Sequence, residues 1–292
     1  MKFRTIIPVP LYPFKISLKN HLFFMGSCFS EHFAHFFQER RFKANDNPFG
    51  ILFNPLSIAF ALDLMTGNRV LSEHFFQYFD GKWISFVHHG KFSHPDKEVF
   101  LSNIHHELSE AQESIQQTDY LFITLGTSYY YFHREKQMVV ANCHKVPAAA
   151  FEKKCANIQQ ITEAFKPFFA WRNLSNPSLK IIFTVSPVRH LADGFHENQL
   201  SKSILHLAVK ELMEQYEDVY YFPSYEIFND DLRDYRFYDK DLCHPSPQGI
   251  EYVEEIVLQS FFDEPTVQQI KIIEKENKQL QHRPLLIVEE KK

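Results

Sequence analysis

The sequence predicts a three-layer α/β/α domain in which a mostly parallel sheet lies between two layers of helices. Four strand-length apolar runs support this prediction, at residues 22–25, 120–125, 180–185 and 219–222. Segments with helical spacing separate these runs. Parallel strands need crossover connections of a dozen or more residues, usually helices. The alternation therefore predicts parallel strands that are covered on both faces.

The first apolar run ends at Gly26, and Ser27 and Cys28 follow before a helix. The helix is predicted from phenylalanines at helical spacing, at positions 29, 33, 36 and 37. Backbone N–H groups at a helix N-terminus favour negative charge. We therefore expect the thiol of Cys28 to ionise more easily than a free cysteine. The simpler alternative is that Ser27 only caps the helix and Cys28 is a small buried side chain.

The elements of the N-terminal part follow from turn residues and apolar spacing. Three prolines predict an extended arm over residues 1–20. Residues 40–51, which contain Gly50, predict a polar loop. Asn54 and Pro55 mark the start of a helix that stops near Gly67. Residues 70–118 are predicted to be mainly helical, with a short strand-like piece at 83–87.

The C-terminal part continues the alternation. Residues 129–132 and 137–141 predict a hairpin that extends from the end of the second strand. Helices are expected over residues 152–171, 200–216 and 247–261. We expect a single domain over residues 1–262 and a charged tail over 263–292. The tail should hold a surface helix followed by a short apolar segment at 285–288.

Composition excludes several classes of function. The net charge is −5 and the pI is near 6.3, without clustered Lys and Arg, which argues against nucleic-acid binding. We find neither a signal peptide nor an apolar stretch of membrane-spanning length, and we expect a cytoplasmic protein without membrane contact. The four cysteines lack a CxxC pair, so we expect free thiols. Five histidines crowd residues 88–106 without zinc-ligand spacing, so no metal or other cofactor is expected. The 31 phenylalanines favour an aromatic core over a ligand platform.

The candidate site lies at the carboxyl ends of the predicted strands, where ligands bind in open parallel sheets. The segments expected there are 26–28, 126–128, 186–190 and 241–244. In the last of them, Asp241 stands three residues before His244, so the carboxylate can orient the imidazole toward Cys28 or Ser27. The same spacing recurs at Asp193 and His196. We favour Asp241 and His244 because they directly precede the last core helix.

Several short motifs resemble those of one known family. Residues 26–30, with the sequence GSCFS, resemble the signature of the GSCFA family, a domain similar to the SGNH/GDSL hydrolase superfamily. Residues 47–55, 125–128 and 186–190 resemble further blocks of that family. The similarity covers most of the chain, from the first strand to the helix after His244.

The resemblance implies a flavodoxin-like fold and ester chemistry on a small acyl group. The superfamily's nucleophilic serine corresponds to Cys28, with Ser27 as the alternative in a shifted register. The amide of Gly50 would join that of Cys28 in an oxyanion hole. Ser128 stands where the superfamily has an asparagine, so its hydroxyl would be the third donor. The superfamily's last block, an aspartate three residues before a histidine, is matched by Asp241 and His244.

We therefore expect an acyl-ester hydrolase or acyltransferase that acts on a small-molecule or carbohydrate ester, without a cofactor. Arg189 and His190 would contact an anionic substrate. Two alternatives stay open. One is a non-catalytic module that uses Cys28, Arg189 and the tyrosines at 129–131 for recognition. The other is a metal or redox site that joins Cys28, Cys243 and His244.

Overall fold

The computed structural model describes residues 4–281 and contains a central parallel sheet of five strands. The strand order is β10-β9-β5-β1-β2, and every neighbouring pair is parallel. The strands are β1 (His21–Gly26), β2 (Lys43–Asp46), β5 (Tyr120–Leu125), β9 (Lys180–Val185) and β10 (Val219–Phe222). The predicted α/β class with a parallel sheet is confirmed.

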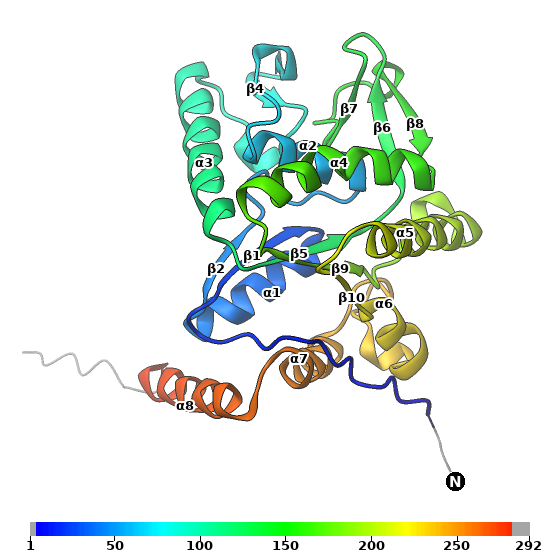
Figure 1. The fold of residues 1–292 in the computed structure, drawn as a ribbon. Helices are drawn as coiled ribbons and strands as arrows, with labels where there is room; N and C mark the ends of the chain where they lie inside the picture. Colours follow the sequence, from blue (N-terminus) through cyan, green and yellow to red (C-terminus); the bar gives the residue numbers. More distant parts are fainter. Residues whose placement is uncertain (1–3, 282–292) are drawn as a thin grey trace, which may run out of the picture.

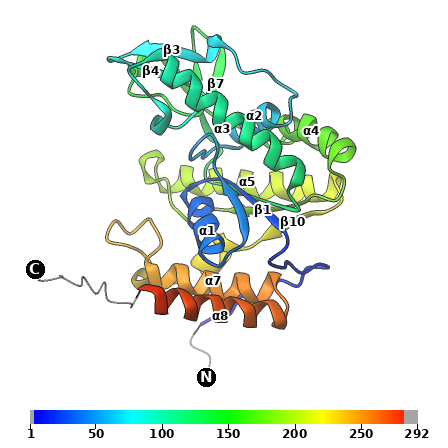
Figure 2. The same cartoon turned by 90° about the vertical axis from the view of Figure 1, so that its left-hand side faces the viewer.

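Helices cover both faces of this sheet, as Figures 1 and 2 show. One face carries α2 (Pro55–Met65), α3 (Lys97–Gln117), α4 (Ile158–Ser175) and α5 (Phe195–Gln215). The other face carries α1 (Cys28–Glu39), α7 (Pro247–Phe261) and α8 (Glu264–Gln281). A short helix, α6 (Ser224–Glu226), follows β10. The three-layer arrangement is that of an α/β/α fold.

The layer between the sheet and α1 is built from aromatic rings. Phe24 of β1 stacks on Phe122 of β5 with ring centroids 4.8 Å apart and on Phe37 of α1 at 5.5 Å. Phe33 and Phe36 are also buried. The helical stripe of phenylalanines therefore faces the sheet, and the prediction of an aromatic core is confirmed for this layer.

Two small antiparallel sheets lie beyond the layer of α2 and α4 (Figure 1). One is the hairpin of β3 (Phe76–Phe79) and β4 (Lys82–Ser85). The other joins β6 (Tyr129–His133) to β7 (Met138–Val140) and β8 (Phe151–Cys155). The predicted hairpin at 129–141 is confirmed, with β8 as an additional third strand.

Three segment predictions are wrong. Residues 70–96 form short 3-10 turns and the β3–β4 hairpin, and α3 starts only at Lys97 behind the N-cap Asp96. The helix expected from residue 152 starts at Ile158, because residues 151–155 alternate between buried and exposed as the β8 edge strand. Residues 43–46, expected in a loop, pair with β1 as the edge strand β2.

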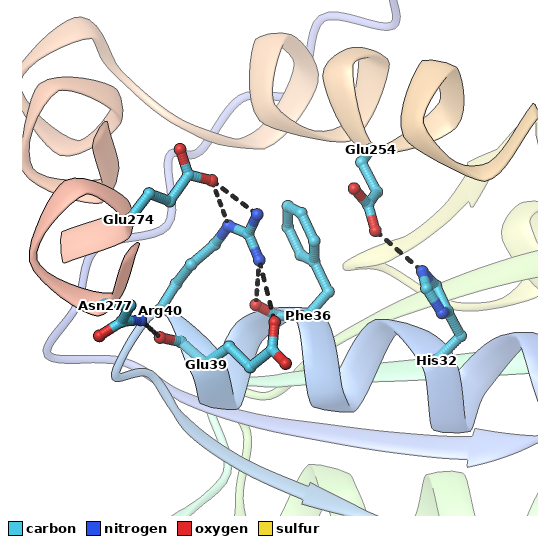
Figure 3. A network of polar contacts seen from close by, with 7 residues as sticks. All are labelled: His32, Phe36, Glu39, Arg40, Glu254, Glu274 and Asn277. Atoms are coloured by element: carbon cyan, nitrogen blue, oxygen red, sulfur yellow. Dashed lines mark hydrogen bonds and ion pairs between the residues drawn. The ribbon is translucent and has the colours of Figure 1, made fainter. Parts of the chain in front are cut away.

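Polar contacts fix α1 against α7 and α8, as Figure 3 shows. Nε2 of His32 lies 2.8 Å from Glu254 of α7, and Arg40 donates to Glu274 of α8 over 2.6 and 2.9 Å. Ile270 of α8 is fully buried. The predicted surface helix of the tail is therefore docked on α1. The apolar segment expected at 285–288 lies outside the described residues.

The N-terminal arm follows the same face as α7. Tyr12 stacks on Phe261 with centroids 4.5 Å apart, and the amide of Ile16 donates to the carbonyl oxygen of Phe261 over 2.8 Å. Residues 4–17 contain no helix, as predicted for an extended arm, whereas residues 18–20 form a turn; Ile16 is buried. Within residues 4–281, no helix combines the length and the apolar character needed to cross a membrane.

Candidate active site

A cleft of about 610 Å³ lies at the carboxyl ends of the strands of the central sheet. Segments that follow four different strands line it, as expected for a site in an open parallel sheet. Cys28 and His244, which are far apart in the sequence, line the same cleft. The other lining residues named below are Ser27, Ile51, Phe53, Thr127, Tyr129, Tyr130, Tyr131, Lys153, Ser186, Arg189, His190 and Asp193.

The turn between β1 and α1 places two small polar side chains in this cleft. Gly26 has a φ of +125°, and a Cβ atom there would lie 2.1 Å from the carbonyl oxygen of Thr124, so only glycine fits. Ser27 is the N-cap residue of α1, but its side chain makes no capping hydrogen bond. Its hydroxyl is buried without a partner among the described residues. The simple capping role considered for Ser27 is therefore not seen.

The environment of Cys28 corrects one prediction. Burial raises the pKa of the Cys28 thiol, whereas hydrogen bonds from the backbone amides of Phe29 and Cys28 and the charge of Lys202 lower it. The net shift is upward. The expectation of easier ionisation was wrong because loss of hydration outweighs the helix N-terminus. At neutral pH, Cys28 therefore rests as a thiol.

Asp241 and His244 form a hydrogen-bonded pair, and His244 lines the cleft. Nδ1 of His244 lies 2.5 Å from Oδ2 of Asp241, and the backbone amides of Cys243 and His244 each donate to Oδ1 over 2.9 Å. The backbone and side-chain hydrogen bonds from His244 hold the pKa of Asp241 below its usual range. A carboxylate only accepts hydrogen bonds, so Nδ1 carries the proton and Nε2 is the free acceptor.

The second pair with the same spacing has a different arrangement. Asp193 binds the ammonium group of Lys153 at the rim of the cleft, and the side chain of His196 is exposed. This difference favours His244, oriented by Asp241, over His196 as the candidate base of the site.

Gly50 lies in a tight turn beside the cleft. Its φ is +74°, and its amide donates to the carbonyl oxygen of Asn47 over 2.7 Å. Ile51, the next residue, lines the cleft. A role for the Gly50 amide as an oxyanion donor would therefore require it to share this hydrogen bond.

Ser128 is not among the residues that line the cleft. It is fully buried, and its hydroxyl contacts Ser201 Oγ at 3.0 Å and Cys155 Sγ at 3.3 Å. The residue before it, Thr127, lines the cleft instead. The structure thus does not bring the Ser128 hydroxyl to the cleft wall with Cys28 and His244.

Arg189 and His190 both line the cleft, but each also contacts the protein. Arg189 donates through Nη2 to the carbonyl oxygen of Leu242 and lies 5.1 Å from the ring centroid of Tyr238. Its guanidinium group thereby holds the loop that carries His244. The His190 ring packs edge-on against Phe53 at 5.7 Å, and burial lowers its pKa to about 4.

A comparison with protein families agrees with these motifs. The model of the GSCFA family matches residues 21–256. The chain belongs to the GSCFA family. No curated protein and no solved structure matches the chain. The part that matches the GSCFA family includes Cys28 and His244 and ends before α8.

Sequence reasoning missed one buried group of this GSCFA domain, Lys202. Its side chain is 1% exposed, and Nζ donates to the carbonyl oxygens of Gly126 and of the cleft residue Ser186 over 2.6 and 2.7 Å. The buried stripe of α5 is apolar except at its start, where it holds Asn198, Ser201 and Lys202 at positions i, i+3 and i+4. This spacing was the sequence signal that could have predicted a buried lysine.

The positions of the side chains give little support to the alternative of a metal or redox site that joins Cys28, Cys243 and His244. Cys243 is not among the residues that line the cleft, whereas Cys28 and His244 are. All four cysteines are free, and no group of three metal-ligating side chains with suitable geometry occurs in the part of the chain that the structure describes.

Proposed function

We propose that this GSCFA protein is an acyl-ester hydrolase or acyltransferase with Cys28 as its nucleophile. The observation that carries the proposal is that Cys28 shares a cleft with His244, whose imidazole is oriented by Asp241. A nucleophile, a base and a group that orients the base are the three parts of a covalent acyl-transfer site. The resemblance to the SGNH/GDSL superfamily supports the same class of chemistry.

In the first step, Cys28 attacks the carbonyl carbon of the ester. Because Cys28 rests as a thiol, its proton passes from Sγ to Nε2 of His244 as the sulfur–carbon bond forms. The π electrons of the carbonyl move to its oxygen, which becomes an oxyanion. Asp241 stabilises the imidazolium ion through Nδ1. The intermediate then collapses to a thioester, and the alcohol leaves with the proton from His244.

In the second step, a water molecule or an acceptor hydroxyl attacks the thioester. His244 removes the proton of the attacking group and returns it to the sulfur, which restores Cys28. Water gives hydrolysis, and an acceptor hydroxyl gives acyl transfer. The oxyanion donors in this scheme are the backbone amide of Cys28 and the hydroxyl of Ser27, which is buried in the cleft without a partner among the described residues.

Ser27 is the alternative nucleophile. Its side chain is 2% exposed, whereas Cys28 is partly exposed in the same cleft. An attacking atom has to reach the carbonyl carbon of a bound ester, so the more exposed sulfur is the better candidate. The buried hydroxyl is better suited to donate a hydrogen bond to the oxyanion.

We propose carbohydrate O-acyl esters as the first substrates to test. Phe53 and the tyrosines at 129–131 line the cleft and offer aromatic faces that suit sugar rings. The hydroxyl of Tyr129 donates to Glu197 over 2.7 Å, which fixes one of these rings at the rim.

Covalent labelling tests the proposal. The protein is treated with an activated acyl ester and, separately, with a fluorophosphonate, and the adduct is mapped by peptide mass spectrometry. We expect an acyl adduct on Cys28 and p-nitrophenyl acetate turnover, both lost in Cys28→Ala. Cys155→Ala is the matched control, because the Cys155 side chain is exposed and outside the cleft lining.

The possible outcomes separate the candidate functions. An adduct on Ser27 would assign the nucleophile to the serine. Turnover that is unchanged in Cys28→Ala would remove Cys28 as the nucleophile, and labelling at neither residue, together with turnover no faster than the uncatalysed reaction, would overturn the enzyme proposal. The non-catalytic alternative is favoured by the raised pKa of Cys28 and would then be tested by sugar binding to the cleft.

A further inference from the structure

A second cavity, of about 570 Å³, adjoins the cleft. Arg189 lines both cavities, and its guanidinium carbon lies 5.1 Å and 5.9 Å from the ring centroids of Tyr238 and Tyr235. Gln199 of α5 and Tyr225 of α6 also line it. We call this space the tyrosine cavity. The acyl-transfer steps proposed above use none of its three tyrosines.

The wall of the tyrosine cavity is joined to the loop that carries the proposed base. Tyr238 pairs with Pro245 in an antiparallel bridge. The amide of the next residue, Asp239, donates to the carbonyl oxygen of His244 over 2.7 Å. A ligand that contacts Tyr238 therefore lies on the same hydrogen-bonded segment as His244.

The amide side chains of the tyrosine cavity have hydrogen-bonding groups left over. The hydroxyl of Tyr225 donates to Oε1 of Gln199 over 2.7 Å, and Nδ2 of Asn229 donates to the carbonyl oxygen of Tyr225 over 2.8 Å. Within residues 4–281, Nε2 of Gln199 and Oδ1 of Asn229 have no hydrogen-bond partner. The cavity thus offers a free amide donor and a free amide acceptor, both held in place through Tyr225.

The chemistry of the tyrosine cavity suits a neutral ligand that is rich in hydroxyl groups. Charged side chains of both signs line it in equal number, among them Arg189 and Asp230, so no net charge attracts a phosphate. The side chain of Tyr235 is 64% exposed, which leaves its ring free to contact a ligand. An aromatic ring packs on the C–H face of a sugar, and amide and carboxylate groups bind its hydroxyls.

We propose that the tyrosine cavity binds a second sugar unit of the substrate, next to the acylated unit in the cleft. The substrate class is then an O-acylated oligosaccharide or polysaccharide and not a single sugar ester. This inference rests on the proposed function of the cleft in acyl transfer. No bond is made or broken in the tyrosine cavity. Contacts there supply binding energy remote from the acyl group, which raises kcat/KM.

Steady-state kinetics on matched pairs of acetylated sugars test the proposal. Each pair is an O-acetylated monosaccharide and the O-acetylated tetrasaccharide of the same sugar, with glucose, xylose, mannose and galactose as the four sugars. The kcat/KM of each variant is divided by its own value for p-nitrophenyl acetate, so that a general change in acyl transfer cancels. We expect the tetrasaccharide to be preferred about tenfold in at least one pair.

Substitutions of Tyr235 assign this preference to the tyrosine cavity. Tyr235→Ala removes the exposed ring and should abolish the preference for the tetrasaccharide. Tyr235→Phe keeps the ring and should retain most of it. Tyr78→Ala is the matched control, because Tyr78 is 55% exposed on β3 and lies outside the lining of both cavities.

Two results would overturn the proposal while the proposed function stands. One is p-nitrophenyl acetate turnover with equal kcat/KM for both members of every pair. The other is a preference for the tetrasaccharide that is the same in Tyr235→Ala as in the unmodified protein.

A binding measurement covers the case that no ester is turned over. Unacetylated tetrasaccharides of the same four sugars are titrated into the unmodified protein and into Tyr235→Ala by isothermal titration calorimetry. We expect at least one to bind the unmodified protein and to bind Tyr235→Ala about tenfold more weakly. Equal affinity in the two proteins, or no binding to either, would refute a sugar site in the tyrosine cavity. Because this measurement needs no acyl group, its result is separate from the failure of the acyl-transfer proposal.

Discussion

The two walls of the cleft are built in opposite ways. The side of Ser27, Cys28 and Lys202, here called the floor, belongs to the core, and Ser27 and Lys202 are 2% and 1% exposed. Another part of the cleft wall is a loop, in which the side chains of Asp241 and His244 are 51% and 53% exposed. One wall is fixed by α1, α5 and the sheet, and the other by a few hydrogen bonds.

The pKa shifts have different causes on the two walls. On the floor, burial raises the pKa of Cys28 and lowers that of Lys202. On the loop, hydrogen bonds from His244 lower the pKa of Asp241, which stays charged. Burial thus disfavours charge on the floor, whereas the loop already holds an oriented carboxylate. Substitutions in the loop should therefore change the rate of ester turnover without changing stability. Substitutions on the floor should change how stability depends on pH.

Removal of the base should have the largest effect. In His244→Ala we expect ester turnover to fall about a thousandfold, within the range typical of a general base. The melting temperature should stay the same, because the side chain is half exposed and its loop is held by Arg189 and backbone hydrogen bonds. Steady-state kinetics with p-nitrophenyl acetate and a thermal melt measure both.

His196→Ala is the matched control for this change. His196 also stands three residues after an aspartate, but its side chain is exposed and Asp193 binds Lys153 instead. Turnover should be unchanged in this variant. An equal loss in His196→Ala, or full turnover in His244→Ala, would remove His244 from the proposed site.

A smaller effect is expected from the arginine that anchors the loop. Arg189 donates to the carbonyl oxygen of Leu242, which has a φ of +58° and is two residues before His244. In Arg189→Met we expect kcat to fall about tenfold with KM unchanged, because a less well fixed base is out of position more often. Kinetics over a range of substrate concentrations separate the two constants.

The same experiment tests the role expected from the sequence. If Arg189 binds an anionic part of the substrate, KM rises for anionic esters and kcat stays constant. Arg233→Met serves as the control, because Arg233 is an exposed arginine in the neighbouring segment and does not contact the loop of His244.

The strands at the centre of the sheet were predictable because their burial is continuous. Residues 120–125 and 180–185 are apolar on both faces, and no helix of that length fits between their flanking turn residues. The edge strand β8 was predicted as helix because Glu152, Lys153 and Lys154 are residues with good helix propensity. Its pairing with β6 overrides that propensity, and this pairing is a tertiary contact that local sequence does not contain.

The candidate site was also only partly predictable from the sequence. The positions of Cys28 and His244 at the strand ends followed from the motif and the topology. The raised pKa of Cys28 could not be predicted in this way. Loss of hydration depends on how deeply the side chain is buried and not on its place in a motif. The polar spacing of Asn198, Ser201 and Lys202 is visible in the sequence, but only the register of α5 against β5 and β9 shows that the ammonium group of Lys202 reaches the ends of these strands.

The last prediction concerns the stability contributed by His190, which lines the same cleft as Cys28. Burial lowers the pKa of His190 to about 4, against about 6.5 in the unfolded chain. Between these values the unfolded chain binds a proton that the folded chain does not, so the free energy of unfolding decreases as the pH falls from 6.5 toward 4. This histidine alone should lower it by about 2 kcal/mol between pH 7 and pH 5.

Urea unfolding at pH 7 and pH 5 measures this loss, and we expect it to be about 2 kcal/mol smaller in His190→Gln than in the unmodified protein. The buried His88, whose pKa burial lowers to about 3, adds a similar term to both proteins and cancels in the difference. His196→Gln, at an exposed position, should keep the full loss. If His190→Gln lost as much stability as the unmodified protein, His190 would be as well hydrated as the exposed loop, and the contrast between the two walls would not extend to this side chain.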